Sequence, residues 1–113
     1  MVFLCEHETQ GMAYQEALST NVPVLAWDPG HWVDPLWEVL SEEPVKSTSV
    51  PYFSDECGLR FAKIFDYKET FNTFWENLEK YEPREFVKNN LSLEKSAEIY
   101  YSYYLESFNN RKR

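Results

Sequence analysis

Two glutamates separated by seven residues, Glu8 and Glu16, are the feature of this sequence that most suggests chemistry. A carboxylate accepts two hydrogen bonds from hydroxyl groups, so such a pair can hold a ligand with hydroxyls at both ends. Gly11 lies between them, at the expected start of a helix. The free backbone N–H groups and the positive end of the helix dipole at such a start favour an anion or sugar hydroxyls. The stretch 8–16 is therefore the first candidate for a binding site.

Two apolar segments are placed to position this stretch. The runs 2–5 and 22–27 are almost continuously apolar, as expected of parallel strands that are covered on both faces. The segment 11–20 between them is amphipathic, so the three segments predict a β-strand–helix–β-strand unit. The polar loop 6–10 then lies at the carboxyl end of the first strand, where open α/β sheets bind their ligands.

The predicted helix and the segment after the second strand carry further expectations. Asn21 suits the left-handed backbone conformation that often ends a helix. The turn-rich segment 28–35 follows the second strand at the same edge of the sheet, and Trp32 and Trp37 are expected to anchor it. The residues of the first helix expected to point inward are Met12, Ala13, Ala17 and Leu18.

After the segment 28–35, the hydrophobic pattern is weak at first and then becomes typical of helices. A helical turn is expected at 36–40 and a short edge strand at 50–53. Asp66 and Glu69 fit a capping box, which predicts a helix from there to about Tyr81. The apolar face of that helix consists of Phe71, Phe74, Trp75 and Leu78.

The last part of the chain is predicted to be helical as well. Pro83 ends the preceding helix, 84–89 forms a short helix or turn, and Ser92 caps a final helix over 93–108. A tyrosine-rich stripe at helical spacing is more often packing than a ligand platform, so we expect this one to be packed. Its members are Leu93, Ala97, Tyr100, Tyr101, Tyr104, Leu105 and Phe108.

Composition excludes several classes of function. The formal net charge is -8 and the pI about 4.7, which disfavours nucleic acid as a partner because backbone phosphates require clustered Lys and Arg. The one basic cluster, at 111–113, is expected to be a solvated tail. No apolar run approaches the ~20 residues of a membrane span, and no signal peptide is evident, so a cytoplasmic location is expected. Cys5 and Cys57 are too few for a disulfide scaffold or a structural zinc site.

The candidate stretch also resembles a known family. Glu8, seven residues and Glu16, followed by a strand that opens with Val-Pro-Val at 22–24, resemble the Glu-x7-Glu motif of GT-B glycosyltransferases of the retaining, group 1 type. Gly11 keeps one family glycine, whereas Thr9 replaces another. The resemblance implies a partial Rossmann-like α/β unit, with a small parallel sheet of two or three strands, a βαβ core and C-terminal helices. Such a unit is the C-terminal portion of the family's donor-binding domain.

The resemblance assigns roles to the candidate residues. The first glutamate of the motif faces the donor sugar, so Glu8 is the catalytic candidate, and the second binds the ribose hydroxyls of the nucleotide. Backbone groups around the glycine receive sugar hydroxyls or the pyrophosphate. The substrate-binding candidates are Glu16, Gly11, Gln10, Met12 and Thr9. Neither a metal nor a cofactor is implied.

At 113 residues the chain is expected to form a single domain, 1–113. With the resemblance, it has three parts: a βαβ donor-site core at 1–35, a loop and edge strand at 36–65, and C-terminal helices at 66–113. The family's basic residues for the pyrophosphate come from earlier strands, and its acceptor site belongs to another domain. We therefore expect the chain to be a C-terminal fragment that works with the upstream part of an enzyme and is inactive alone. If the chain exists alone, self-association is expected to protect its open strand edge.

Other interpretations of the same residues stay open. Glu8 and Glu16 are, without the motif, a solvated loop acid and an exposed helix acid. The pair His7-Glu8 starts like a zinc-protease motif, but Gly11 stands at the place of the second histidine. Arg60 and Arg84 are phosphate partners or members of surface ion pairs.

Two further functional classes compete with the glycosyltransferase hypothesis. The main alternative is a non-catalytic α/β module that uses its aromatic final helix as an interface. A flavodoxin-like phosphoacceptor domain would require a phosphoryl-accepting aspartate, for which Asp28 is the candidate. Asp28, His31 and Asp34 together either line an acceptor cleft, bind a cation or form a hydrogen-bonded loop.

Overall fold

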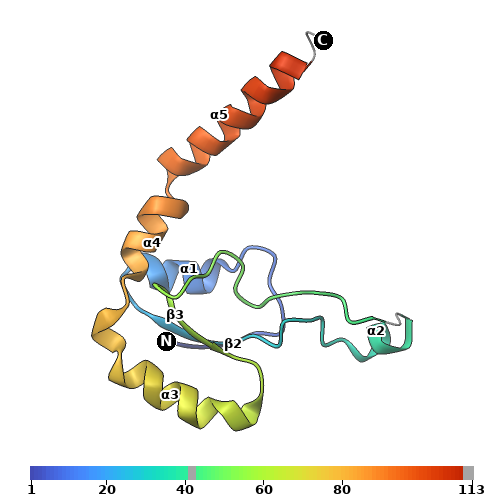
Figure 1. Ribbon diagram of the computed structural model, residues 1–113, viewed down its shortest axis with the longest axis vertical. Coiled ribbons are helices and arrows are strands. Elements are labelled where there is room, and N and C mark those ends of the chain that lie inside the picture. Colours follow the sequence, from blue (N-terminus) through green and yellow to red (C-terminus); the bar gives the residue numbers. More distant parts are fainter. Residues whose placement is uncertain (41–42, 111–113) are drawn as a thin grey trace.

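The computed structural model describes residues 1–40 and 43–110 and has an α/β fold (Figure 1). The basic cluster at 111–113 lies outside the described residues. Three parallel strands form one sheet in the order β1-β2-β3, with bounds β1 (Val2–Leu4), β2 (Val24–Trp27) and β3 (Gly58–Phe61). Helix α1 (Met12–Ser19) connects β1 to β2. This arrangement confirms the predicted βαβ core and the partial Rossmann-like fold class.

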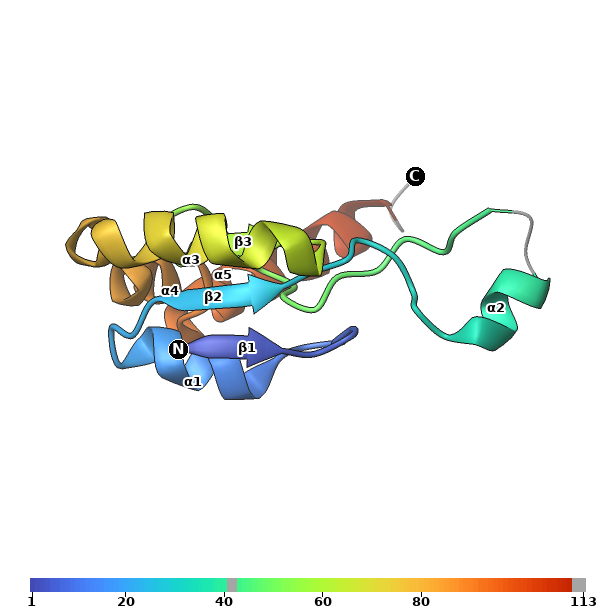
Figure 2. The same ribbon diagram turned by 90° about the horizontal axis from the view of Figure 1, so that it is seen from below.

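The remaining elements are α2 (Pro35–Leu40), η1 (Ile64–Asp66), α3 (Tyr67–Glu76), η2 (Leu78–Lys80), α4 (Pro83–Asn90) and α5 (Leu93–Asn110). Helices α1 and α4 cover one face of the sheet and α3 covers the other (Figures 1 and 2). Helix α2 lies at the tip of the long excursion between β2 and β3, away from the sheet, and α5 extends away from α4 (Figure 1). Within the described ranges, every helix is too short or too polar to cross a membrane.

The core lies on both faces of β2, whose side chains alternate between the two. Val24 and Ala26 pack on the α1 side and Leu25 on the α3 side, and all three are fully buried. The α1-side cluster consists of Tyr14, Leu18, Val24, Ala26, Val50, Cys57 and Phe86. The α3-side cluster consists of Leu25, Phe61 and Phe74. A central strand buried on both faces explains the continuous apolar run in its sequence.

The third strand is not the one predicted. Residues 50–53 do not form a strand: the chain bends over 49–52, where Tyr52 has a φ of 58°, and the strand that pairs with β2 is β3. Gly58 at its start has a φ of 139°, and a Cβ there would overlap the backbone of Val24. Only a glycine allows this close approach of two strands. The run Gly-Leu-Arg-Phe has little apolar pattern, which is why sequence periodicity did not indicate it.

Helix α1 is rotated relative to the prediction. Met12 and Ala13 are exposed, whereas Tyr14 is fully buried together with Leu18. The ring of Tyr14 packs against Phe3 of β1, and its hydroxyl donates a hydrogen bond to the carbonyl of Pro51. Because Tyr14 faces the sheet, Met12 and Ala13 face outward. Asn21 has the left-handed φ of 65° expected at the end of the helix, and that prediction is confirmed.

Three packing predictions for the aromatic residues are wrong. Trp75 is exposed because it lies on the outer side of α3, stacked on Phe71. Trp37 is partly exposed on α2, so it does not anchor its loop. The tyrosine-rich stripe of the last helix is exposed along its whole length, since α5 has no buried residue.

The helix ends differ in part from the prediction. Asp66 makes no capping hydrogen bond, because its backbone is already helical in η1, so the capping box with Glu69 does not form. Helix α3 ends at Glu76, and the separate turn η2 follows it instead of a continuation to Tyr81. The cap of α5 is confirmed: the Ser92 hydroxyl accepts a hydrogen bond from a backbone N–H at 3.2 Å.

Candidate functional site

Glu8 lies in the loop at the carboxyl end of β1, as expected from the sequence. Its backbone N–H donates to the carbonyl of Thr48 at 3.0 Å, which connects the loop to the segment that returns from α2 toward β3. The Cys5 thiol lies 3.7 Å from Oε1 of the half-buried Glu8 side chain. The carboxylate is thus held at the edge of the sheet with part of its hydrogen-bonding capacity free.

A stacked pair of rings beside Glu8 was not predicted as part of a site. His7 and Trp32 stack with their ring centroids 3.7 Å apart. His7 Nδ1 and Trp32 Nε1 are buried and have no hydrogen-bond partner among the described residues. Buried polar atoms without partners are uncommon in native proteins and mark places where a ligand or water completes the bonding. The sequence gives little indication that His7 and Trp32 are neighbours, because the two residues lie far apart in the chain.

Gly11 begins α1 with a left-handed φ of 73°. A Cβ at this position would overlap the ring of Tyr14, with Cδ1 2.8 Å away. The glycine is therefore required by the packing of Tyr14 inside the chain. Its role in a close approach to a ligand, which the resemblance implies, remains a prediction.

Three of the predicted substrate-binding residues line two neighbouring hollows. Met12 and Glu16 lie one turn apart on the outer side of α1 and line a hollow of about 220 Å³ against α4. Gln10 lines a larger hollow of about 600 Å³ beneath the junction of α4 and α5. Leu91 lines both, so the two hollows adjoin. The described lining residues of these hollows do not include Glu8, and Thr9 is exposed in the loop beside them.

The larger hollow has a lining suited to an uncharged polar group. Its wall combines aromatic rings with amide and hydroxyl groups, and the described residues include none that is charged. Gln10 is held in place by two hydrogen bonds with Gln15. Tyr52 has a left-handed φ of 58°, an uncommon conformation for a non-glycine residue. Aromatic faces and amides together bind sugar rings or nucleosides better than they bind phosphates.

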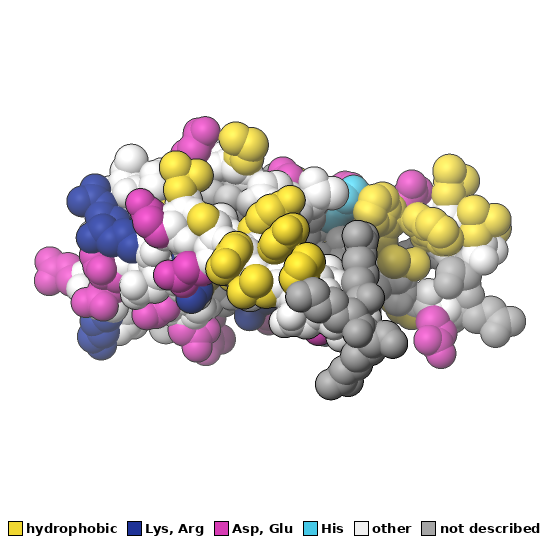
Figure 3. Space-filling view, turned by 90° about the horizontal axis from the view of Figure 1, so that it is seen from above, with side chains coloured by type: hydrophobic (Ala, Val, Ile, Leu, Met, Phe, Trp, Pro, Cys, Tyr) yellow, Lys and Arg dark blue, Asp and Glu magenta, His cyan; other side chains and the backbone are white. Residues whose placement is uncertain are grey.

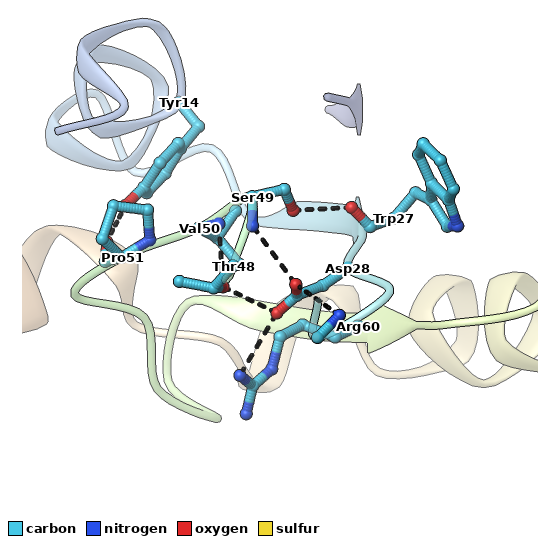
Figure 4. Close-up of polar contacts among 9 residues, drawn as sticks. Tyr14, Trp27, Asp28, Thr48, Ser49, Val50, Pro51 and Arg60 are labelled. Carbon is cyan, nitrogen blue, oxygen red and sulfur yellow. Dashed lines mark hydrogen bonds and ion pairs between the residues drawn. The ribbon is translucent and has the colours of Figure 1, made fainter. Parts of the chain in front are cut away.

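Asp28 takes part in a structural network rather than an open site (Figure 4). Its carboxylate accepts hydrogen bonds from the Thr48 hydroxyl at 2.8 Å and the Ser49 backbone N–H at 3.2 Å. Arg60 lies 3.6 Å from the same carboxylate. Asp34 similarly accepts a bond from the Leu36 backbone N–H at 2.9 Å. These contacts favour the hydrogen-bonded loop among the interpretations of this segment.

The side chain of Arg84 connects two helices. Its Nε donates a hydrogen bond to the carbonyl of Ser19 at 3.1 Å, which joins α4 to the end of α1. In the described part of the chain, no group of three His, Cys, Asp or Glu side chains is arranged to hold a metal ion.

A cavity of about 700 Å³ lies on the α3 side of the sheet, next to β1. Its wall is almost wholly apolar and includes Val2, Leu4 and Tyr67. This cavity lies on the face of the sheet opposite α1, away from the candidate residues. A wall with so little polar surface gives a nucleotide or a sugar few hydrogen-bonding partners.

No family model, no curated protein and no solved structure matches this chain. Its function is therefore inferred from its own residues.

Proposed function

We propose that this chain provides part of the nucleotide-sugar donor site of a glycosyltransferase. The observation that carries the proposal is that Gln10, Met12 and Glu16 line two adjoining hollows along α1, where it faces α4 and the start of α5. The loop that holds Gln10 follows the carboxyl end of β1, the edge at which open α/β sheets bind their ligands. The Glu-x7-Glu spacing assigns the same residues to the donor.

The geometry supports separate roles for the two glutamates. Glu16 is exposed on the outer face of α1, where its carboxylate is free to accept bonds from the two ribose hydroxyls. Glu8 is half-buried in the loop next to His7, whose ring stacks on that of Trp32, and its carboxylate can accept hydrogen bonds from sugar hydroxyls. In the whole enzyme, the donor sugar lies near Glu8 and is transferred to an acceptor bound elsewhere.

The proposal also requires a contribution from outside this chain. The described lining of the two hollows contains no Lys or Arg, and the chain has a net charge of -8. A diphosphate carries negative charge that cationic side chains or backbone amides must balance. The amides at the start of α1 supply part of this balance, and an upstream part of the same enzyme supplies the rest.

The test is a titration of the isotope-labelled chain with UDP, GDP and their sugar conjugates, followed by NMR amide shifts. We expect shifts in the stretch 8–16 and near Leu91. Glu16→Gln keeps the size of the side chain and removes its charge, and should weaken binding by about tenfold, because one charge-assisted pair of bonds is weakened.

Glu69→Gln is the matched control, since Glu69 lies on α3, on the other face of the sheet. It should bind as the unmodified chain does. Equal affinities for the Glu16→Gln and Glu69→Gln chains would contradict the proposal. The absence of shifts with every nucleotide would show that this chain does not bind the donor alone, and the same two variants are then compared in a chain that carries the upstream part of the enzyme.

One observation favours a second candidate function, that of a non-catalytic assembly module. Helix α5 carries a long row of exposed aromatic and aliphatic side chains and has no buried residue. Such a surface is typical of a protein–protein interface.

A further inference from the structure

The apolar stripe of α5 has no partner within the described chain. The helix spans Leu93–Asn110 and leaves the body of the molecule at α4 (Figure 1). Figure 3 shows hydrophobic side chains gathered in the middle of the face from which α5 projects. The large exposed members of the stripe are Leu93, Tyr100, Tyr101, Tyr104, Leu105 and Phe108. We call this surface the α5 stripe.

Other residues of α5 face the body of the molecule. Ser96, Ile99 and Tyr103 line the hollow beneath the α4–α5 junction. At 100° per residue, the centre of the α5 stripe lies about 130° around the helix from these three residues, so most of the stripe points away from the hollow. Tyr104 and Phe108 stack within the stripe, with ring centroids 6.4 Å apart. The stripe is thus an ordered apolar face that the fold leaves exposed.

The α5 helix lacks the usual main source of helix stability. In proteins most of the stability of a helix comes from tertiary packing of its apolar face. The stripe is about 22 Å long at 1.5 Å per residue. At ~200 Å² for a fully exposed aromatic side chain, its four rings expose on the order of 500 Å². Two such faces together expose about 1,000 Å² of ring surface, so full burial of both reaches the lower limit for a specific interface.

We propose that the α5 stripe pairs with the same stripe of a second copy of this chain, with the two helices antiparallel. A two-fold axis that passes between Tyr100 and Tyr101 makes the interface self-complementary. It places Leu93 opposite Phe108, and Ala97 opposite Tyr104. The small alanine then receives the large ring, which is the alternation of small and large residues that close helix packing requires.

The dipole of α5 favours this direction over a parallel one. Antiparallel pairing brings opposite ends of the two helices together, so their dipoles attract each other. Glu94 and Glu98 lie in the amino-terminal half of the helix, where Lys95 pairs with Glu98 at 3.2 Å. Parallel pairing would place the glutamates beside their own copies. The acidic polar face also disfavours a membrane surface, which selects Lys and Arg.

The first test is the self-association of the full chain, measured by sedimentation over a range of concentrations. We expect a dimer whose population rises with concentration. Tyr104→Arg should weaken dimerisation by about tenfold or more, as expected for the loss of a central tyrosine. Tyr103→Arg is the matched control: Tyr103 is 64% exposed and Tyr104 58%, but they lie on different sides of the same helix.

Equal dimerisation of the Tyr103→Arg and Tyr104→Arg chains would overturn the proposal. A chain that stays monomeric at every concentration would overturn it too, and would leave the stripe to a different protein. Circular dichroism of both variants shows whether each still folds.

The second test determines the direction of the helices by disulfide formation. Chains carrying Ala97→Cys and chains carrying Tyr104→Cys are each oxidised alone and then as a mixture. The antiparallel arrangement should give a cross-linked dimer mainly in the mixture, because position 97 of one copy meets position 104 of the other. Cross-linking of each variant with itself indicates parallel helices and contradicts the proposal. The unmodified chain controls for reaction of Cys5 and Cys57.

Discussion

The ring of Tyr14 occupies the space next to the Cα of Gly11, where any other residue would place its Cβ. Because Gly11 also has a φ of 73°, two independent requirements select glycine at the start of α1. The ring reaches past it to donate a hydrogen bond to Pro51, in the excursion between β2 and β3 (Figure 4). This pair of residues therefore couples the candidate binding loop to the core.

We expect Gly11→Ala to lower the free energy of unfolding by about 2–4 kcal/mol, measured by urea denaturation. Left-handed backbone at a non-glycine residue costs about 1–2 kcal/mol, and the overlap with Tyr14 adds to this. Gly30→Ala is the matched control, since Gly30 has a φ of 78° but nothing near its Cα. Gly30→Ala should lower the free energy of unfolding only by the cost of the left-handed backbone. Equal losses in the two variants would show that the Tyr14 ring moves away freely.

Tyr14 should also give the chain a distinctive response to alkaline pH. Burial raises the pKa of its hydroxyl to about 12, against about 10 in the unfolded chain. A group with a raised pKa favours folding below about pH 10, and this contribution is lost as the pH rises from about 10 to about 12. Tyr14→Phe removes the hydrogen bond to Pro51 and should cost about 1 kcal/mol at neutral pH.

The difference in stability between Tyr14→Phe and the unmodified chain should therefore shrink between about pH 10 and pH 12. Urea denaturation at a series of pH values measures it. Tyr100→Phe, at an exposed position of α5, should follow the unmodified chain throughout. A difference between Tyr14→Phe and the unmodified chain that stays constant over this range would contradict the pKa assignment.

Asp28→Ala should cost about 2–3 kcal/mol of unfolding free energy, because it leaves the Thr48 hydroxyl and the Ser49 N–H without their acceptor. Asp34→Ala removes one bond at an exposed turn and should cost about 1 kcal/mol. Arg60→Ala should cost less than about 1 kcal/mol, since the guanidinium is half exposed. Thermal and urea unfolding of the three variants check this order. Similar losses for both aspartates would mean that the Asp28 network is not structural.

Phe74→Ala and Trp75→Ala test which side of α3 is packed. Phe74 is 4% exposed and belongs to the core cluster with Leu25, so its loss should cost about 3–5 kcal/mol. Trp75 is 64% exposed, and its truncation should cost about 1 kcal/mol or less, chiefly its stacking on Phe71. Denaturant midpoints measure both. A larger effect at Trp75 would mean that a partner covers this side of the helix in solution.

The sequence by itself determined the βαβ core of this protein. Continuous apolar runs identify parallel strands because burial on both faces leaves no polar positions, and Asn21 marks the end of α1 because its side chain tolerates left-handed backbone. The sequence also placed Glu8 in a loop and Glu16 on a helix, since local patterns set both. Whether these two residues bind a nucleotide sugar remains a prediction for the titration.

Tertiary packing decided the rest. β3 was not evident from its own four residues, because it exists only through pairing with β2 and requires Gly58 where the two backbones meet. The rotation of α1 follows from the fit of Tyr14 against the sheet, which periodicity does not encode. The apolar stripe of α5 was predicted correctly, but the prediction that it is packed was wrong. Helical periodicity shows that one face is apolar, but only the packing of the whole chain shows whether anything covers it.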